Sequence, residues 1–197
     1  ELVNNAQDVA ESFALAIMTT DLVPKTVSTT VALSGGTVRL TGICKGSGMI
    51  HPNMATMLGY FLTDLKLAPG VAQELLSKAN EVSFNMISVD GDSSTNDCAF
   101  LMASGESRVE LANDQDYKLF KAALTEVAQV LAQSIAADGE GATKLIEVNL
   151  TGSPKLDLAR KAARGVTMSP LIKTAVHGED PNWGRILSRL GAEQVPA

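Results

Sequence analysis

Residues 45–64 change abruptly in character half-way along, and the change limits how this part of the chain folds. Residues 45–53 include two glycines, a proline and an asparagine, which favour an irregular, exposed backbone. Residues 57–62 are a nearly unbroken apolar run, typical of a buried strand or a short core helix. We therefore expect a loop that leads Ala55 and Thr56 to the start of a buried element.

Thr56 has two interpretations. Threonine is common in strands, so its position alone favours an ordinary residue at the entry to a strand. A threonine hydroxyl becomes a nucleophile when a base takes its proton, and a cut before Thr56 would free an α-amino group, of reference pKa about 7.7–8.0, as that base. The small Ala55 and the glycines upstream permit attack of Thr56 Oγ on the Ala55 carbonyl. Position alone therefore favours the ordinary role and leaves the nucleophile as the alternative.

Composition limits the classes of partner and the compartment. The 197 residues are 45% hydrophobic, enough for one domain with a real core. A net charge of −6 without a Lys/Arg block argues against a nucleic-acid or anionic-membrane partner. Cys44 and Cys98 lack paired CxxC spacing, so we expect buried free thiols in a reducing cytosol. The sequence shows no secretory signal and no apolar run of 18 residues, so we expect a cytoplasmic protein.

Hydrophobic periodicity predicts alternating helices and strands. Two β-branched runs flank Ser-Gly-Gly and indicate a hairpin, 29–33 with 37–44, whose second strand leads into the loop. Further strands are expected at 57–62, 98–103 and 144–150, and helices at 6–18, 71–82, 114–137, 156–168 and from Pro181, with Asp180 as its cap. The fold class we predict is α/β (α+β), with sheets covered by helices.

Two further features suggest sites that the residues support poorly. The acidic loop 89–97 faintly resembles a calcium loop, but its glycine is misplaced and Leu101 stands where a glutamate should close it. Asp90 and Asp92 are then turn formers. His177 invites a triad with Cys98 or a serine, yet no GxSxG pattern occurs. We expect neither a metal nor an organic cofactor.

Several motifs resemble those of the ornithine acetyltransferase family, the glutamate N-acetyltransferases of arginine biosynthesis. They cover most of the chain: Met-Thr-Thr-Asp at 18–21, the loop and apolar run at 45–64, Val-Asp-Gly-Asp-Ser-Ser-Thr-Asn-Asp at 89–97, Asp-Gly-Glu-Gly-Ala-Thr-Lys at 138–144, and the stretches 169–175 and 178–185. The sequence departs from the family at Ser93, where threonine is usual, and at Met86, where arginine is common.

The resemblance implies a fold, a reaction and a site. The fold would be an αββα sandwich. The chain would cut itself between Ala55 and Thr56, and the freed Thr56 would be the nucleophile. Thr19, Lys45 and Glu140 would contact substrate together with Thr56. The family moves an acetyl group from N2-acetylornithine to L-glutamate through an acetyl-threonine intermediate, and some members also accept acetyl-CoA.

Other implications concern assembly and the limits of the resemblance. Residues 1–55 would be the C-terminal part of the family's α segment and residues 56–197 most of its β segment, in one folded unit and in a heterotetramer of two α and two β chains. Family members also carry an upstream Thr-Gly oxyanion hole and a C-terminal tail that these 197 residues lack.

Several alternatives remain open. Thr20 is an alternative to Thr19 as the substrate contact, and by sequence alone Glu140 is interpreted as a solvated loop charge. A self-processing aminopeptidase or amidase, and an inactive fragment of the transferase, also remain open.

Overall fold

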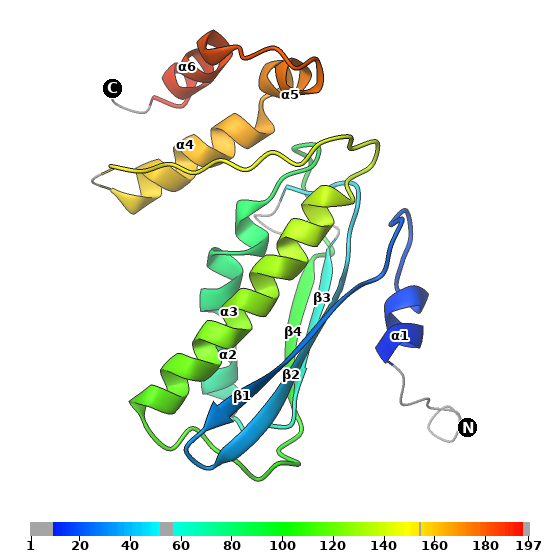
Figure 1. Cartoon of the computed structure of the whole chain (residues 1–197), viewed down its shortest axis with the longest axis vertical. Helices are drawn as coiled ribbons and strands as arrows, with labels where there is room; N and C mark the ends of the chain where they lie inside the picture. Colours follow the sequence, from blue (N-terminus) through cyan, green and yellow to red (C-terminus); the bar gives the residue numbers. More distant parts are fainter. Residues whose placement is uncertain (1–9, 52–56, 154, 195–197) are drawn as a thin grey trace.

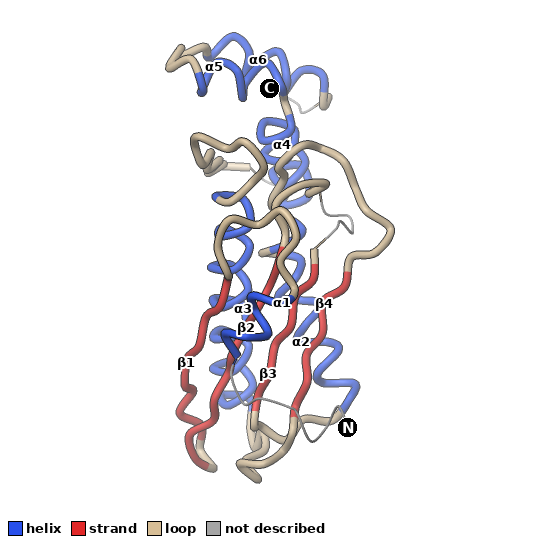
Figure 2. Tube along the Cα trace, turned by 90° about the vertical axis from the view of Figure 1, so that its right-hand side faces the viewer, coloured by secondary structure: helices blue, strands red, loops and turns tan. Residues whose placement is uncertain are grey.

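A four-stranded sheet forms the centre of the structure, a computed structural model that describes residues 10–51, 57–153 and 155–194. Its strands lie in sequence order across the sheet (Figure 2): β1 (Lys25–Leu33), β2 (Gly36–Lys45), β3 (Leu58–Thr63) and β4 (Cys98–Ala103). The pairs β1–β2 and β2–β3 are antiparallel, whereas β3 and β4 are parallel. The 45–64 segment therefore begins in β2 and returns through the adjacent strand β3.

Helices α2 (Pro69–Glu81) and α3 (Asp114–Ala137) cover one face of the sheet, and the short α1 (Ala10–Ala16) lies on the other (Figure 1). A 3₁₀ turn, η2 (Phe84–Met86), follows α2. The helices α4 (Leu156–Met168), α5 (Pro170–His177) and α6 (Trp183–Ala192) gather beyond one end of the sheet. None of the described helices is both long and apolar enough to span a bilayer.

The core lies between the sheet and the helices α2 and α3. It is mainly aliphatic, with three phenylalanines, Phe61, Phe84 and Phe120, that are almost completely buried. The long helix α3 approaches β2 closely at Gly42, where a Cβ atom would lie 2.6 Å from Val127 Cγ1 and 2.7 Å from Leu131 Cδ1. Glycine at this position thus sets the spacing between helix and sheet.

The mixed α/β class is confirmed, and so are most of the expected elements. The described residues form one sheet with one main helical layer. The hairpin, the 57–62 and 98–103 strands and the helices at 71–82, 114–137 and 156–168 all appear, with small shifts at their ends. Of the expected helix 6–18, residues 10–16 form α1, residues 17 and 18 lie past its end, and residues 6–9 lie outside the described range.

Three expectations were wrong. Residues 144–150 are extended but form no strand, because no described strand lies beside them to complete a ladder. Helix α6 begins at Trp183 with Asn182 as its cap, whose side chain accepts a hydrogen bond from the Arg185 amide at 3.1 Å. Cys44 is buried, but Cys98 is exposed, because it lies on the open face of the edge strand β4.

Candidate functional site

Three residues assigned to substrate contact from the sequence lie together. Lys45 is the last residue of β2, Thr19 lies in the turn after α1, and Glu140 follows the end of α3. All three line one cavity of about 260 Å³, together with Thr20, Ser47, Gly48 and Met49. Lys45 Nζ donates a hydrogen bond to Thr19 Oγ1 at 3.2 Å. The cavity therefore contains a cation, a carboxylate and hydroxyl groups within a small volume.

Glu140 is held over Gly48 by the backbone. The Glu140 amide donates a hydrogen bond to the Ser47 carbonyl at 2.9 Å. A Cβ atom on Gly48 would lie 2.7 Å from Glu140 Cδ, so the carboxylate occupies the space that a side chain would fill. Sequence reasoning missed Gly48, although the Gly-Ser-Gly run after Lys45 signals a close approach of the backbone.

Ala55 and Thr56 lie outside the described residues, but the chain on the C-terminal side is well anchored. The amide of Met57 donates a hydrogen bond to Asp97 Oδ1 at 2.6 Å. Burial raises the pKa of Asp97 to about 6, against the lowering effects of the Met57 bond and the Lys45 charge. Asp97 Oδ2 is buried without a hydrogen-bond partner among the described residues. Sequence reasoning treated Asp97 only as part of a motif.

The loop on the N-terminal side is anchored by Asp90, whose carboxylate accepts hydrogen bonds from the amides of Met49, at 2.5 Å, and Ile50, at 3.1 Å. Asp90 also accepts from the Asp92 amide at 3.0 Å, as expected of a turn former. The longer-range bonds were not foreseen, because residues 49 and 90 are far apart in sequence. The acidic loop thus holds residues 49 and 50 in place.

His51 connects the same loop to helix α4. His51 Nδ1 lies 3.2 Å from Ser88 Oγ, and Arg164 Nη2 lies 3.1 Å from His51 Nε2. Burial and the Arg164 charge lower the pKa of His51 below its usual value. A neutral His51 imidazole suits a position next to a guanidinium.

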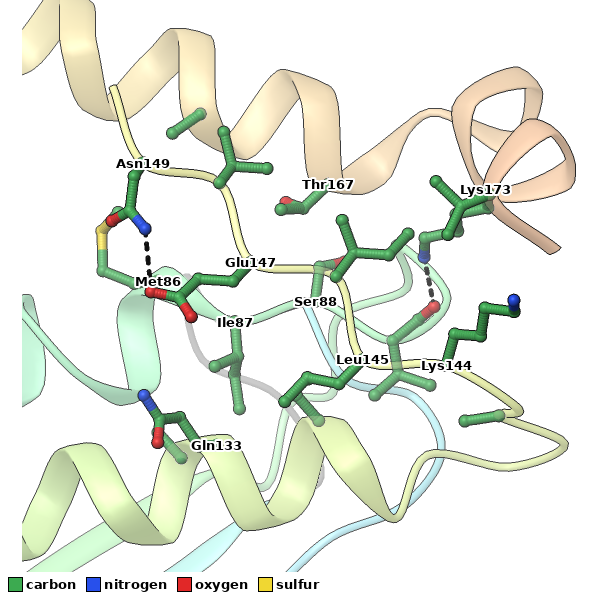
Figure 3. A pocket seen from close by; sticks show the side chains of 18 of the residues that line it. Met86, Ile87, Ser88, Gln133, Lys144, Leu145, Glu147, Asn149, Thr167 and Lys173 are labelled. Atoms are coloured by element: carbon green, nitrogen blue, oxygen red, sulfur yellow. Dashed lines mark hydrogen bonds between the residues drawn. The ribbon is translucent and has the colours of Figure 1, made fainter. Parts of the chain in front are cut away.

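A larger cavity of about 660 Å³ lies elsewhere, between α3, α4 and the extended residues 143–149 (Figure 3). It shares Glu140 with the small cavity, but Thr19 and Lys45 do not line it. Its border includes His177, whose Nδ1 lies 3.0 Å from Thr143 Oγ1, so the described contact of this histidine is not with Cys98 or a serine. Within the described ranges, no group of three or more His, Cys, Asp or Glu side chains is placed to hold a metal ion.

Comparison with known proteins identifies the family. The model of the ArgJ family matches residues 1–197. The chain belongs to the ArgJ family. This agrees with the resemblance seen in the motifs, because curated ArgJ relatives are described as arginine biosynthesis bifunctional proteins.

Individual ArgJ proteins align over much of the chain. The protein from Chlorobaculum tepidum is 56% identical over 178 residues, which are 90% of this chain and 44% of the relative. The protein from Lactococcus lactis is 51% identical over 187 residues, 94% of this chain and 47% of the relative. The crystal structure of ArgJ from Bacillus halodurans superposes with a TM-score of 0.69 at 42% identity, and covers 72% of this chain and 68% of that one. The chain thus spans about half the length of these curated relatives.

Proposed function

We propose that the protein to which this chain belongs transfers the acetyl group of N2-acetylornithine to L-glutamate. One observation carries the proposal: Thr19, Lys45 and Glu140 line the same small cavity. A lysine holds an α-carboxylate and a glutamate holds an ammonium group, so the pair suits a zwitterionic amino acid. The cavity volume is about 260 Å³, slightly below the roughly 300 Å³ at which pockets for drug-sized ligands usually begin. A cavity of this size suits a small metabolite.

In the proposed reaction Thr56 is first freed by hydrolysis of the Ala55–Thr56 bond. Thr56 Oγ attacks the Ala55 carbonyl and the acyl group moves from nitrogen to oxygen; water then splits the ester and leaves an Ala55 carboxylate and a free Thr56 amine. Thr56 Oγ then attacks the acetyl carbonyl carbon, while its α-amino group takes the hydroxyl proton and passes it to the departing ornithine nitrogen. An acetyl ester on Thr56 and free ornithine result. In the second half, the amine of glutamate attacks the ester, its proton returns to Thr56 Oγ, and N-acetylglutamate leaves. No cofactor enters this balance.

The pairing of β2 with β3 supports continued association after cleavage. β2 belongs to residues 1–55 and β3 to residues 56–197, and the two strands are antiparallel neighbours from Leu40↔Thr63 to Lys45↔Leu58. Separating the pieces would break this ladder and divide the core. We propose that the two pieces form one folded unit within a cytoplasmic heterotetramer of two α and two β chains, and that acetyl-CoA serves as a second acetyl donor.

Variants of Thr56 in the full-length protein test the proposal. Thr56→Ala removes the hydroxyl and should give an intact chain that forms no N-acetylglutamate. Thr56→Ser should still cleave, more slowly, because serine lacks the methyl group that limits rotation about χ1. Thr37→Ala, an exposed threonine of β2, is the matched control and should behave as the parent. Intact mass measures cleavage, and an efficiently cleaved, active Thr56→Ala protein would overturn the assignment.

The acceptor needs a separate assay, because an amidase with the same nucleophile would pass the acetyl group to water. We expect ornithine release from acetylornithine to depend on added glutamate and to match N-acetylglutamate formation mole for mole. Release of free acetate at the same rate without glutamate would favour the hydrolase.

A further inference from the structure

A buried charge cluster is formed by Asp21, Lys25 and Asp138, and it is hydrogen-bonded to residues that line the small cavity. These side chains belong to the turn after α1, the start of β1 and the end of α3, and the residues are 7%, 3% and 9% exposed. Lys25 Nζ donates hydrogen bonds to Asp21 Oδ1 at 2.7 Å, to Asp138 Oδ2 at 2.6 Å and to the Val23 carbonyl at 3.3 Å. All three protons of the ammonium group are therefore used.

The cluster is bonded to each of the three segments that carry a candidate substrate residue. Asp21 accepts hydrogen bonds from the amide of Thr19 itself, at 3.3 Å, and from the amide of Gly46, next to Lys45, at 2.7 Å. Burial pushes the pKa of Asp21 upward, but the bonds from Gly46, Lys25 and Thr19 outweigh it and leave that pKa below its usual value. The Asp21 carboxylate is thus charged when it holds these two amides.

Asp138 makes the third connection. Its backbone carbonyl accepts a hydrogen bond from Ser47 Oγ at 2.7 Å, and the Ser47 carbonyl in turn accepts from the Glu140 amide at 2.9 Å. Asp138 Oδ2 also accepts from the Leu22 amide at 3.0 Å, which fixes the turn that carries Thr19. The Thr19 and Lys45 segments are therefore bonded to the carboxylates of the cluster, and the Glu140 segment is bonded through Ser47 to the backbone of Asp138.

We infer that Asp21, Lys25 and Asp138 are positioning residues, which set the spacing of Thr19, Lys45 and Glu140 around the bound amino acid. The inference rests on the proposed function for the identity of the substrate. Charges so deeply buried are costly to desolvate, and well-packed apolar residues often serve stability equally well. Directional bonds to the three segments give the cluster a role that apolar packing lacks, since a displacement of about 1 Å at a site can cost 100-fold in rate.

The test uses the full-length protein with Asp138→Asn, Asp21→Asn and Lys25→Met. Asparagine keeps the size and one acceptor oxygen of aspartate, so these two variants should fold even if Lys25→Met does not. The matched control is Asp116→Asn, a buried carboxylate in the first turn of α3 that accepts hydrogen bonds from Ser34 and Ala112. It lies about 33 Å from Asp138 along the helix at 1.5 Å per residue.

We expect the cluster variants to lower kcat/KM for acetylornithine at least tenfold, mainly through a higher KM. Asp116→Asn should lower the denaturation midpoint by about as much as the cluster variants do. Its KM for acetylornithine should stay within about twofold of the parent's. Cluster variants with the KM of the parent would overturn the inference. Suppose that the cluster variants keep the KM of the parent, that the parent transfers acetyl groups and that Glu140→Gln raises KM. Then only the positioning role is wrong, and the proposed function stands. If the parent transfers no acetyl group, the proposed function is wrong.

Discussion

The Met57 backbone and Asp97 are joined by a hydrogen bond of 2.6 Å, from the Met57 amide to the Asp97 carboxylate. The Met57 carbonyl accepts a second bond, from the Cys98 amide at 3.1 Å. Both polar groups of the Met57 backbone are therefore fixed to the start of β4. Met57, the second residue after the expected cleavage bond, thus has a defined position at the entry to β3.

The raised pKa of Asp97 predicts a pH dependence of stability. Because its folded pKa of about 6 lies above the ordinary value of 3.8, the folded state holds this proton more tightly. The contribution is fully present below about pH 4 and is lost as the pH rises through 6. Asp97→Asn cannot titrate, so the stability of the parent relative to the variant should fall by about 2 kcal/mol between pH 4 and 7. Urea unfolding of both full-length proteins at several pH values measures it, and a constant difference would contradict the prediction.

Glu140→Gln should weaken the use of acetylornithine. A charge-assisted hydrogen bond to the substrate's side-chain ammonium is worth about 1.5–3 kcal/mol, so kcat/KM should fall by about one to two orders of magnitude. Cleavage before Thr56 should continue. Glu147→Gln is the matched control, because Glu147 lines the larger cavity and bonds to Asn149 instead. Equal kinetics of Glu140→Gln and the parent would contradict the role of Glu140.

Gly48→Ala should impair function while sparing stability. The added methyl group would lie 2.8 and 2.9 Å from the two Glu140 carboxylate oxygens, so the carboxylate must move. It is the end of a flexible side chain, and the free energy of unfolding should change by less than about 1 kcal/mol, whereas KM for acetylornithine should rise about tenfold. Gly70→Ala, whose new methyl group meets nothing within 4 Å, is the control for kinetics and unfolding. An unchanged KM would show that the Glu140 carboxylate is not needed where it lies.

Gly42→Ala should have the opposite profile. Its methyl group would enter the closed space between β2 and α3, against Val127 and Leu131, whose side chains are buried. Overpacking of this kind costs about 1–3 kcal/mol. Denaturant unfolding should show that loss, with KM little changed because Gly42 does not line the small cavity. A variant as stable as the parent would mean that α3 adjusts freely against the sheet.

Local patterns predicted the elements that local forces determine. The β-branched run of residues 37–44 and the long helical repeat of α3 identified these elements closely. The prediction of a strand from the alternation of residues 144–150 was wrong, because a side-chain pattern indicates two faces but not whether a neighbouring strand exists. Exposure of Cys98 likewise depends on which face of β4 is covered, which the sequence of one strand does not state.

The residues of the candidate site were named from the sequence only where a motif identified them. Thr19, Lys45 and Glu140 were named through family motifs, and the small cavity unites them. The charge cluster next to these residues could not be predicted from the sequence, because Lys25 and Asp138 are 113 positions apart and meet only after α3 packs on the sheet. A buried lysine between two aspartates has no local pattern, since its partners are supplied by tertiary structure.

The outer edge of strand β4 affects how this chain behaves in solution. It pairs with β3 on one side, and in the described sheet no strand pairs with its other side. The sequence Cys-Ala-Phe-Leu-Met-Ala carries neither a charge nor a proline, which are the usual protections of an open strand edge. Such an edge accepts an incoming strand through its backbone groups. Expressed as these 197 residues alone, the protein should therefore self-associate edge to edge and aggregate as its concentration rises.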